Sequence, residues 1–417
     1  MSTTLVATHP VVAERARRRS LRAALTSPPG ALSLVLLLGA GLRLWMLAHD
    51  VPTLDSDEAT FGLMALHVAR GDWSVFMWGQ PYMGTIETLC IAPFVVLFGP
   101  SALTLRLGPM LLGLAFVATV YIMASRIYSR RIGLYTAALL AVGSPFIVVL
   151  SVRAYGGYVE TLLFGNLLLL LALSGGAPRG WSVWRAALTG LIAGLALWTD
   201  VLVAPYVALV CLIFWWQRRT DLRGRTGLAL LVGLLVGAAP ALAYNTTHGA
   251  PTLGSVLALT VAGSHGANAS PTVLTTLPAN LWRELTVSLP ILLGGSLGGT
   301  QGAGLTPADY LREAAARPVA YGIALVLGLC ALALFACAAL RVIRSCREMS
   351  LRVSKGSVCD PALVRRQGEV ALLLLAVCYA GAFALSSQSD IFAAPRYLLP
   401  LVSVTPVLVA QGARLLN

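Results

Sequence analysis

Residues 101–124 read SALTLRLGPMLLGLAFVATVYIMA, an apolar run with one charged residue, Arg106, near its start. A helix of that length crosses the hydrocarbon core of a bilayer, which needs roughly 20 apolar residues. Nine comparable runs occur elsewhere in the chain, at 31–49, 132–151, 157–173, 185–199, 201–216, 226–244, 319–340, 369–386 and 397–413. The sequence therefore predicts an all-α, polytopic helical membrane protein with about 10 transmembrane helices, forming one transmembrane domain over residues 1–417.

The composition of the chain supports this prediction and excludes other classes. Of the 417 residues, 57% are hydrophobic and 11% are charged, and the mean hydropathy is +0.80. A soluble core could not bury so much apolar surface. The net charge of +13 comes from arginines clustered between the apolar runs, which is typical of topology signals, so no nucleic acid is expected as a partner. The seven cysteines have neither disulfide-framework nor metal-knuckle spacing.

The charge distribution predicts how the chain is threaded through the membrane. Two shorter apolar runs, about 85–98 and 286–298, are predicted to be interfacial or re-entrant helices. With these two left out as spans, 22 of the 30 basic residues fall on one side, which the positive-inside rule places in the cytoplasm. We therefore expect a multi-pass protein of the cell membrane, with a cytoplasmic N-terminus and cytoplasmic basic segments at 1–30 and 341–368.

The opposite, extracytoplasmic side then carries two long loops, at 50–99 and 245–318. Twelve of the 17 acidic residues fall on this side, so we look there for chemistry and expect the first loop to be catalytic. The second loop is rich in Gly, Thr, Ser and Pro, especially over 294–304, and is predicted to be mobile.

The densest group of carboxylates is Asp55-Ser56-Asp57-Glu58, directly after the first apolar run. Asp55 as N-cap and Glu58 three residues later fit a capping box, a purely structural explanation for both. Capping needs no third acid, so Asp57 stays unexplained. A deprotonated Asp57 could accept a proton from a hydroxyl, or could join Glu58 in holding a divalent cation, Mg²⁺ or Mn²⁺, against a phosphate.

Ionisable residues at the edges of other apolar runs are further candidates. Glu87 and Glu160 lie where a charge is expensive unless it faces a cavity or a partner, and pairing with Arg153 is an alternative role for Glu160. Arg153 and Arg396 lie on the outer side against the charge bias, where a guanidinium could bind phosphate or anchor to membrane lipid headgroups.

Tyrosines beside these arginines have two explanations. The rings of Tyr155 and Tyr158 could stack on a sugar, or could belong to the aromatic belt that anchors membrane proteins at the interface.

Several short motifs follow one another along the chain. They are the acidic pair Asp57-Glu58, Gly71-Asp72-Trp73, Gly79-Gln80-Pro81-Tyr82, Phe98-Gly99, Leu105-Arg106-Leu107 and, near the end, Pro395-Arg396-Tyr397. In this order and spacing they resemble the membrane-embedded GT-C glycosyltransferases, in particular the lipid A aminoarabinose transferases and the protein O-mannosyltransferases. The resemblance is strong over residues 31–150 and patchy afterwards.

The resemblance implies a donor made of a sugar on a polyprenyl phosphate, an acceptor glycan, lipid or protein on the outer face, and inversion at the anomeric carbon. It maps the catalytic base onto Asp57, assisted by Glu58 or Glu160. The chain departs from the family pattern in carrying Glu160 where a second Asp is common, and in ending just after its last predicted span. The residues expected to bind substrate are Asp55, Glu87, Arg153, Tyr155, Tyr158, Arg396 and Tyr397.

Two other classes of function stay open at this point. A transporter or flippase of a polyprenyl-linked or amphiphilic substrate would carry charges and helix breaks in mid-membrane, in paired halves. Here the acids gather at the outer rim and Arg43 is the charge left inside a predicted span, a pattern that favours an interfacial enzyme. A non-catalytic membrane assembly subunit would tolerate the loss of Asp57.

Overall fold

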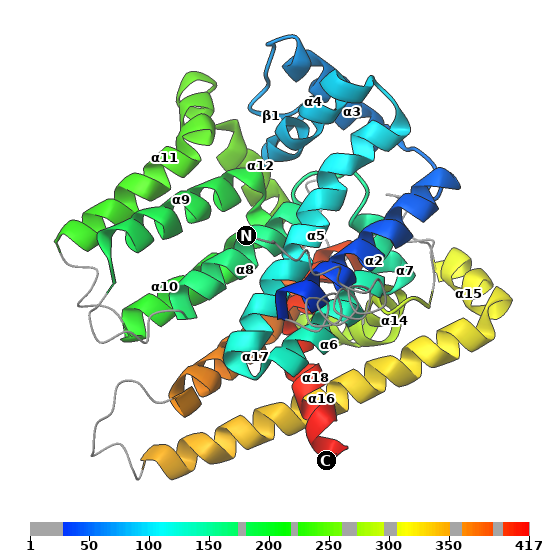
Figure 1. The fold of residues 1–417 in the computed structure, drawn as a ribbon, viewed down its shortest axis with the longest axis vertical. Coiled ribbons are helices and arrows are strands. Elements are labelled where there is room, and N and C mark those ends of the chain that lie inside the picture. The colour runs from blue at the N-terminus through cyan, green and yellow to red at the C-terminus, as the bar shows by residue number, and fades with distance from the viewer. Residues whose placement is uncertain are drawn as a thin grey trace, which may run out of the picture.

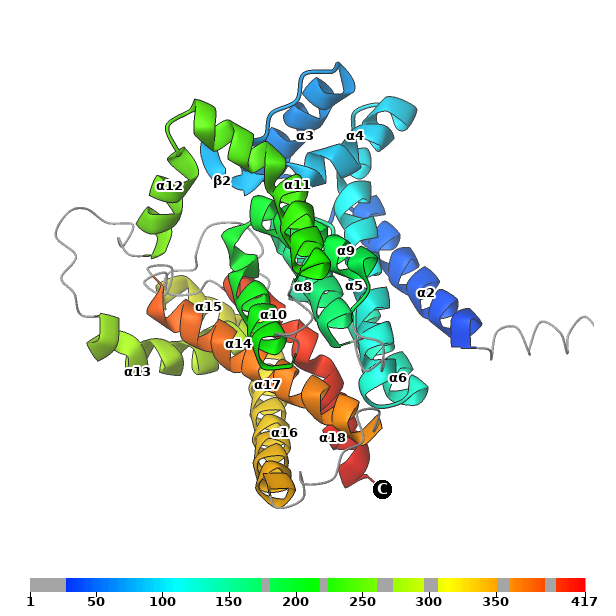
Figure 2. The same ribbon diagram turned by 90° about the vertical axis from the view of Figure 1, so that its left-hand side faces the viewer.

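A computed structural model describes residues 28–173, 181–217, 224–260, 273–295, 307–350, 361–386 and 395–416. Over these residues the chain is a bundle of helices with one two-stranded antiparallel sheet, which confirms the predicted all-α membrane fold (Figures 1 and 2). Figure 1 shows α3, α4 and β1 gathered at one end of the molecule and α18 at the other. We call these the α3 end and the α18 end.

Six helical segments of the described chain are long and apolar enough to cross a membrane. They are α2 (Pro28–Ala48), α5 (Ala102–Ile127), α11 (Arg225–Thr247), α16 (Pro318–Ser350), α17 (Pro361–Leu385) and the continuous pair η5 (Pro395–Val404) and α18 (Thr405–Leu415). Shorter apolar helices are α4 (Ile86–Phe98), α8 (Tyr158–Leu173), α9 (Val183–Thr199) and η1 (Val201–Val203) with α10 (Ala204–Gln217). Nine of the ten predicted runs thus fall on helices of similar extent.

The tenth run, 132–151, was predicted as one continuous span, and this prediction is wrong. The run divides into α6 (Arg130–Val142) and α7 (Pro145–Leu150). Gly143 ends α6 with φ of +57°, a conformation that glycine adopts readily, and Ser144 caps α7 just before Pro145. The Gly-Ser-Pro sequence inside the apolar run was the available signal.

Arg43, the charge left inside the first span, explains how this break is tolerated. Its guanidinium donates to the Ala141 carbonyl at 2.8 Å and to the Ser151 hydroxyl at 2.9 Å, and its side chain is 1% exposed. Ala141 lies in the last turn of α6, where a carbonyl has no partner within the helix. Arg43 therefore satisfies a backbone group that the helix break exposes inside the bundle.

The two predicted outer loops contain short elements. The first holds α3 (Ser56–Ala69), β1 (Phe76–Met77), β2 (Gln80–Gly84) and α4, which is shorter than a span requires. The second holds α12 (Pro251–Thr260), α13 (Val273–Arg283), the π-helical turn η2 (Glu284–Ser288), α14 (Leu289–Leu292) and α15 (Pro307–Ala316). Within this loop, which was predicted to be mobile, residues 261–272 and 296–306 lie outside the described residues.

Helices α9 and α11 pack against each other through glycines. Gly190 and Gly194 on α9 face α11, while Gly233 and Gly237 face α9. A Cβ added at Gly237 would lie 2.8 Å from the backbone nitrogen of Leu195, so the two backbones approach as only small residues allow.

Replacing Gly237 by Leu should therefore destabilise the protein by about 1–3 kcal/mol, through overpacking at this crossing. Thermal unfolding of the purified protein in detergent measures the effect. The matched control is Gly41→Leu on α2, where an added Cβ meets no atom within 4 Å. Equal shifts of the unfolding midpoint in the two variants would contradict the close crossing.

Candidate active site

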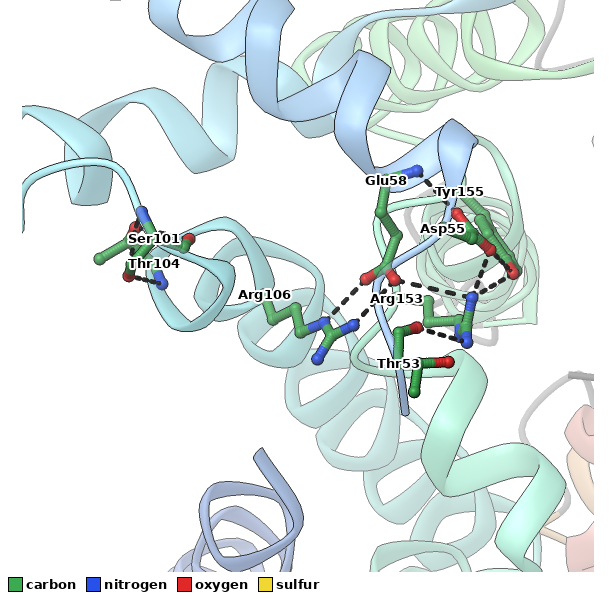
Figure 3. A network of polar contacts seen from close by, with 8 residues as sticks. All are labelled: Thr53, Asp55, Glu58, Ser101, Thr104, Arg106, Arg153 and Tyr155. Carbon is green, nitrogen blue, oxygen red and sulfur yellow. Dashed lines mark hydrogen bonds and ion pairs between the residues drawn. The ribbon is translucent and has the colours of Figure 1, made fainter. Parts of the chain in front are cut away.

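Arg153 lies in the segment between α7 and α8 and is 1% exposed. One of its terminal nitrogens donates to the Asp55 carboxylate and to the Tyr155 hydroxyl, and the other donates to the Thr53 carbonyl at 3.0 Å (Figure 3). The Glu58 carboxylate lies 3.6 Å from the same guanidinium. Tyr155 is close to Arg153 in the sequence. The other partners, Thr53, Asp55 and Glu58, all lie near the start of α3.

Glu58 is held from the other side by Arg106 of α5. Both Glu58 oxygens accept hydrogen bonds of 2.8 Å from Arg106, and the Glu58 side chain is fully buried. The start of α5 is fixed in turn by a capping box between Ser101 and Thr104 (Figure 3). Two arginines and two carboxylates therefore form a charge-balanced buried network.

Half of the predicted capping box is confirmed. The Asp55 side chain accepts from the Glu58 backbone nitrogen at 3.0 Å and so caps α3, but the Glu58 carboxylate turns to Arg106 and does not reach back. Sequence reasoning missed this role of Arg106; a lone arginine inside an apolar run was the signal that could have indicated it.

Asp57 lies between these two acids and differs from both. It is half-buried and makes no hydrogen bond or ion pair with any residue that the structure describes. Burial raises the pKa of the Asp57 carboxyl above its ordinary value of 3.8, and the charge of Asp55 raises it further, while Arg396 and Arg153 oppose the shift. Asp57 is the acid of this segment that remains available for chemistry.

Arg396 and Tyr397 come from the other end of the sequence, at the start of η5. The Arg396 guanidinium lies over the Tyr397 ring, 5.2 Å from its centroid, and forms no ion pair with a described residue. The Tyr397 ring packs between Tyr158 of α8, at 6.2 Å, and Phe383 of α17, at 5.8 Å. The charge of Arg396 lies close enough to Asp57 to lower the pKa of that carboxyl.

Tyr82 of β2 connects the first outer loop to the same region. Burial raises the pKa of Tyr82 to about 12, with contributions from Tyr397, Asp200 and Asp57, whereas Arg396 lowers it. Asp200, between α9 and η1, accepts from the Leu202 backbone nitrogen at 2.7 Å, and burial raises its pKa to about 6. Tyr82, Asp200 and Arg396 therefore lie close enough for their charges to influence one another.

The Gly156-Gly157 turn packs closely against Asp200. Its glycines have φ of +61° and +80°, a conformation that other residues rarely adopt, and a Cβ on Gly157 would lie 2.6 Å from an Asp200 oxygen. The buried Glu87 carboxylate accepts from the Gly156 nitrogen at 2.6 Å. Burial raises the pKa of Glu87 well above its ordinary value, the nearby Glu160 raises it further, and the Gly156 hydrogen bond opposes the shift.

Glu160 is also fully buried, and neither of its oxygens has a hydrogen-bond partner among the described residues. Arg153 is committed to Asp55, Tyr155 and Glu58, so the alternative in which Arg153 pairs with Glu160 is wrong. The structure brings Asp55, Glu58, Arg153 and Tyr155 into one network, and places Asp57, Arg396, Tyr397 and Tyr158 beside it.

The residues present do not fit the predicted metal site. Among the residues that the structure describes, no group of three or more His, Cys, Asp or Glu side chains converges as metal ligands would. Glu58, one of the two expected ligands, has both oxygens engaged by Arg106. A divalent cation therefore enters no step below.

The overall fold of the chain is similar to that of a GT-C glycosyltransferase of known structure. The chain matches the crystal structure of ArnT from Cupriavidus metallidurans bound to undecaprenyl phosphate, with a TM-score of 0.53 and 16% identity over 89% of this chain. It spans 59% of the length of that ArnT chain. This likeness confirms the fold that the sequence resemblance implies.

A second match is the oligosaccharyltransferase AglB from Archaeoglobus fulgidus in complex with an inhibitory peptide and a dolichol-phosphate. Its TM-score is 0.47, with 14% identity over 92% of this chain and 50% of AglB. No protein-family model matches the chain, and no curated protein sequence matches it.

Replacing Glu58 by Gln should destabilise the protein by about 3–5 kcal/mol, because it leaves Arg106 and Arg153 buried with a single carboxylate. Thermal or SDS-induced unfolding of the purified protein measures this loss. The control is Asp72→Asn, which breaks the exposed pair of Asp72 with His67 and should change stability by less than about 1 kcal/mol. A Glu58→Gln variant as stable as the control would argue against the buried network.

Proposed function

We propose that the protein is a glycosyltransferase that moves a sugar from a polyprenyl-phosphate donor to an acceptor hydroxyl on the extracytoplasmic face. The observation that carries this proposal is Asp57, a half-buried carboxylate that has a raised pKa, makes no hydrogen bond or ion pair with a described residue, and lies within electrostatic reach of Arg396. The GT-C fold and the undecaprenyl phosphate in the ArnT structure support a lipid-linked donor.

In the proposed reaction, Asp57 acts as general base. The acceptor oxygen attacks the anomeric carbon while its proton passes to the Asp57 carboxylate. The bond between the anomeric carbon and the phosphate oxygen breaks, and polyprenyl phosphate leaves with the electron pair. Attack opposite to the leaving group inverts the anomeric centre. A raised pKa makes the Asp57 carboxylate a stronger base than an ordinary aspartate.

Arg396 is the residue we assign to the departing phosphate. Arg153 was an equal candidate in the sequence, but its guanidinium is 1% exposed and already engaged by Asp55, Tyr155 and the Thr53 carbonyl. Arg396 has no competing carboxylate partner in the described chain, and a guanidinium stabilises the charge that develops on a phosphate oxygen. Tyr397 and Tyr158, packed beside it, would form the apolar wall of the donor site.

The other predicted residues become positioning residues in this proposal. Asp55, Glu58 and Arg153 fix the start of α3 and thereby the place of Asp57. Glu87 holds the turn that leads into α8. Glu160 is fully buried in the described structure and is given no contact with substrate.

Asp57→Asn should lower transfer by about 10²–10⁴-fold, because the amide cannot accept the proton. The assay is transfer of radiolabelled sugar from synthetic polyprenyl-phosphate hexoses to membrane acceptors, with unfolding midpoints measured in parallel. Asp50→Asn, an exposed acid of the same loop, is the control and should retain activity. Equal product from Asp57→Asn and the intact protein would remove Asp57 from the mechanism.

The pH dependence of transfer should report the ionisation of Asp57. Because the base must be deprotonated, kcat/KM should rise with pH through a pKa above the ordinary value of 3.8. Arg396 lowers this pKa, so Arg396→Gln should move the acid limb to higher pH in whatever activity remains. An acid limb that stays in place, or moves to lower pH, would show that the two groups do not interact.

A further inference from the structure

The α18 end of the bundle carries a group of arginines around one buried carboxylate. Glu369 of α17 is 4% exposed, and the same oxygen lies 3.0 Å from Arg341 of α16, 3.6 Å from Arg365 of α17 and 3.5 Å from Arg414 of α18. Each of these arginine side chains is between 32% and 40% exposed. One carboxylate cannot neutralise three guanidinium groups, so the group keeps an excess of positive charge.

A hollow of about 410 Å³ opens beside this group. It is lined by Cys337, Leu340, Arg341, Arg344 and Ser345, which follow one face of α16. Two guanidinium groups and a hydroxyl lie toward its α18 end, whereas Cys337 and Leu340 give an exposed apolar wall on the side of the span. Arg344 is exposed and forms no ion pair with a described residue.

We propose that this hollow binds an anionic phospholipid, with the headgroup phosphate on Arg341 and Arg344 and the start of an acyl chain along Leu340 and Cys337. Guanidinium groups bind phosphate through two parallel hydrogen bonds, and clusters of basic residues at the cytoplasmic end of a membrane helix attract anionic headgroups. The apolar wall favours a lipid over a free phosphate ion, because a free ion gains nothing from it.

Two features of α16 support a lipid as the occupant. Only 17% of the residues in its most apolar window are buried inside the protein, so most of this window lies on a surface that a surrounding membrane would contact. The arginines lie at the end predicted to be cytoplasmic, where anionic lipids attract basic residues. The positive-inside rule alone would place arginines on this side, but it does not require three helices to bring them to one carboxylate.

The test is lipid retention by the full chain, measured by native mass spectrometry after equal exposure to phosphatidylglycerol and phosphatidylcholine. Phosphatidylglycerol should be retained preferentially, and Arg344→Gln should weaken its binding by about fivefold, the effect of roughly one basic residue near an anionic surface. The control is Arg131→Gln, an exposed arginine on the same predicted side, which should bind as the intact protein does.

Arg341→Gln is a second variant, read together with its unfolding midpoint because Arg341 also pairs with Glu369. Equal retention of the two lipids, or equal loss of phosphatidylglycerol in Arg344→Gln and Arg131→Gln, would overturn the proposal. Competition by inorganic phosphate as strong as that by phosphatidylglycerol would identify a simple anion site and would overturn the lipid as its occupant.

Discussion

The burial of Arg153 is the constraint on which the rest of the site depends. A guanidinium that is 1% exposed must be matched by carboxylates, and Asp55 and Glu58 supply them from the start of α3, with Arg106 completing the balance. This requirement fastens the first outer loop to α5 and to the segment before α8. Asp57 is held in place because Asp55 and Glu58, which flank it in the sequence, are fixed by these ion pairs.

The same network decides which charges are left for chemistry. It engages Asp55, Glu58 and Arg153, and it leaves Asp57 and Arg396 without an ion-pair partner among the described residues. These two come from opposite ends of the sequence, and the charge of Arg396 lowers the pKa of Asp57. An acid able to take a proton therefore lies within electrostatic reach of a guanidinium able to stabilise a phosphate.

Hydropathy predicted most of the helices, because unpaired backbone groups are costly in a bilayer and a helix pairs them within one segment. It failed over 132–151, where Gly143, Ser144 and Pro145 break an otherwise apolar run. Asp57 could be singled out because capping explains two acids but not three. The pairing of Glu58 with Arg106 could not be predicted, since no local pattern tells which of several arginines a folded chain brings to a given carboxylate.

The most direct test of the account separates donor binding from chemistry in two variants. Equilibrium binding of the donor, a radiolabelled polyprenyl-phosphate hexose supplied without acceptor, should be unchanged in Asp57→Asn, although transfer is lost, and should be weakened in Arg396→Gln. Transfer by Asp57→Asn at the rate of the intact protein, or undiminished donor binding by Arg396→Gln, would contradict the roles assigned to the two residues.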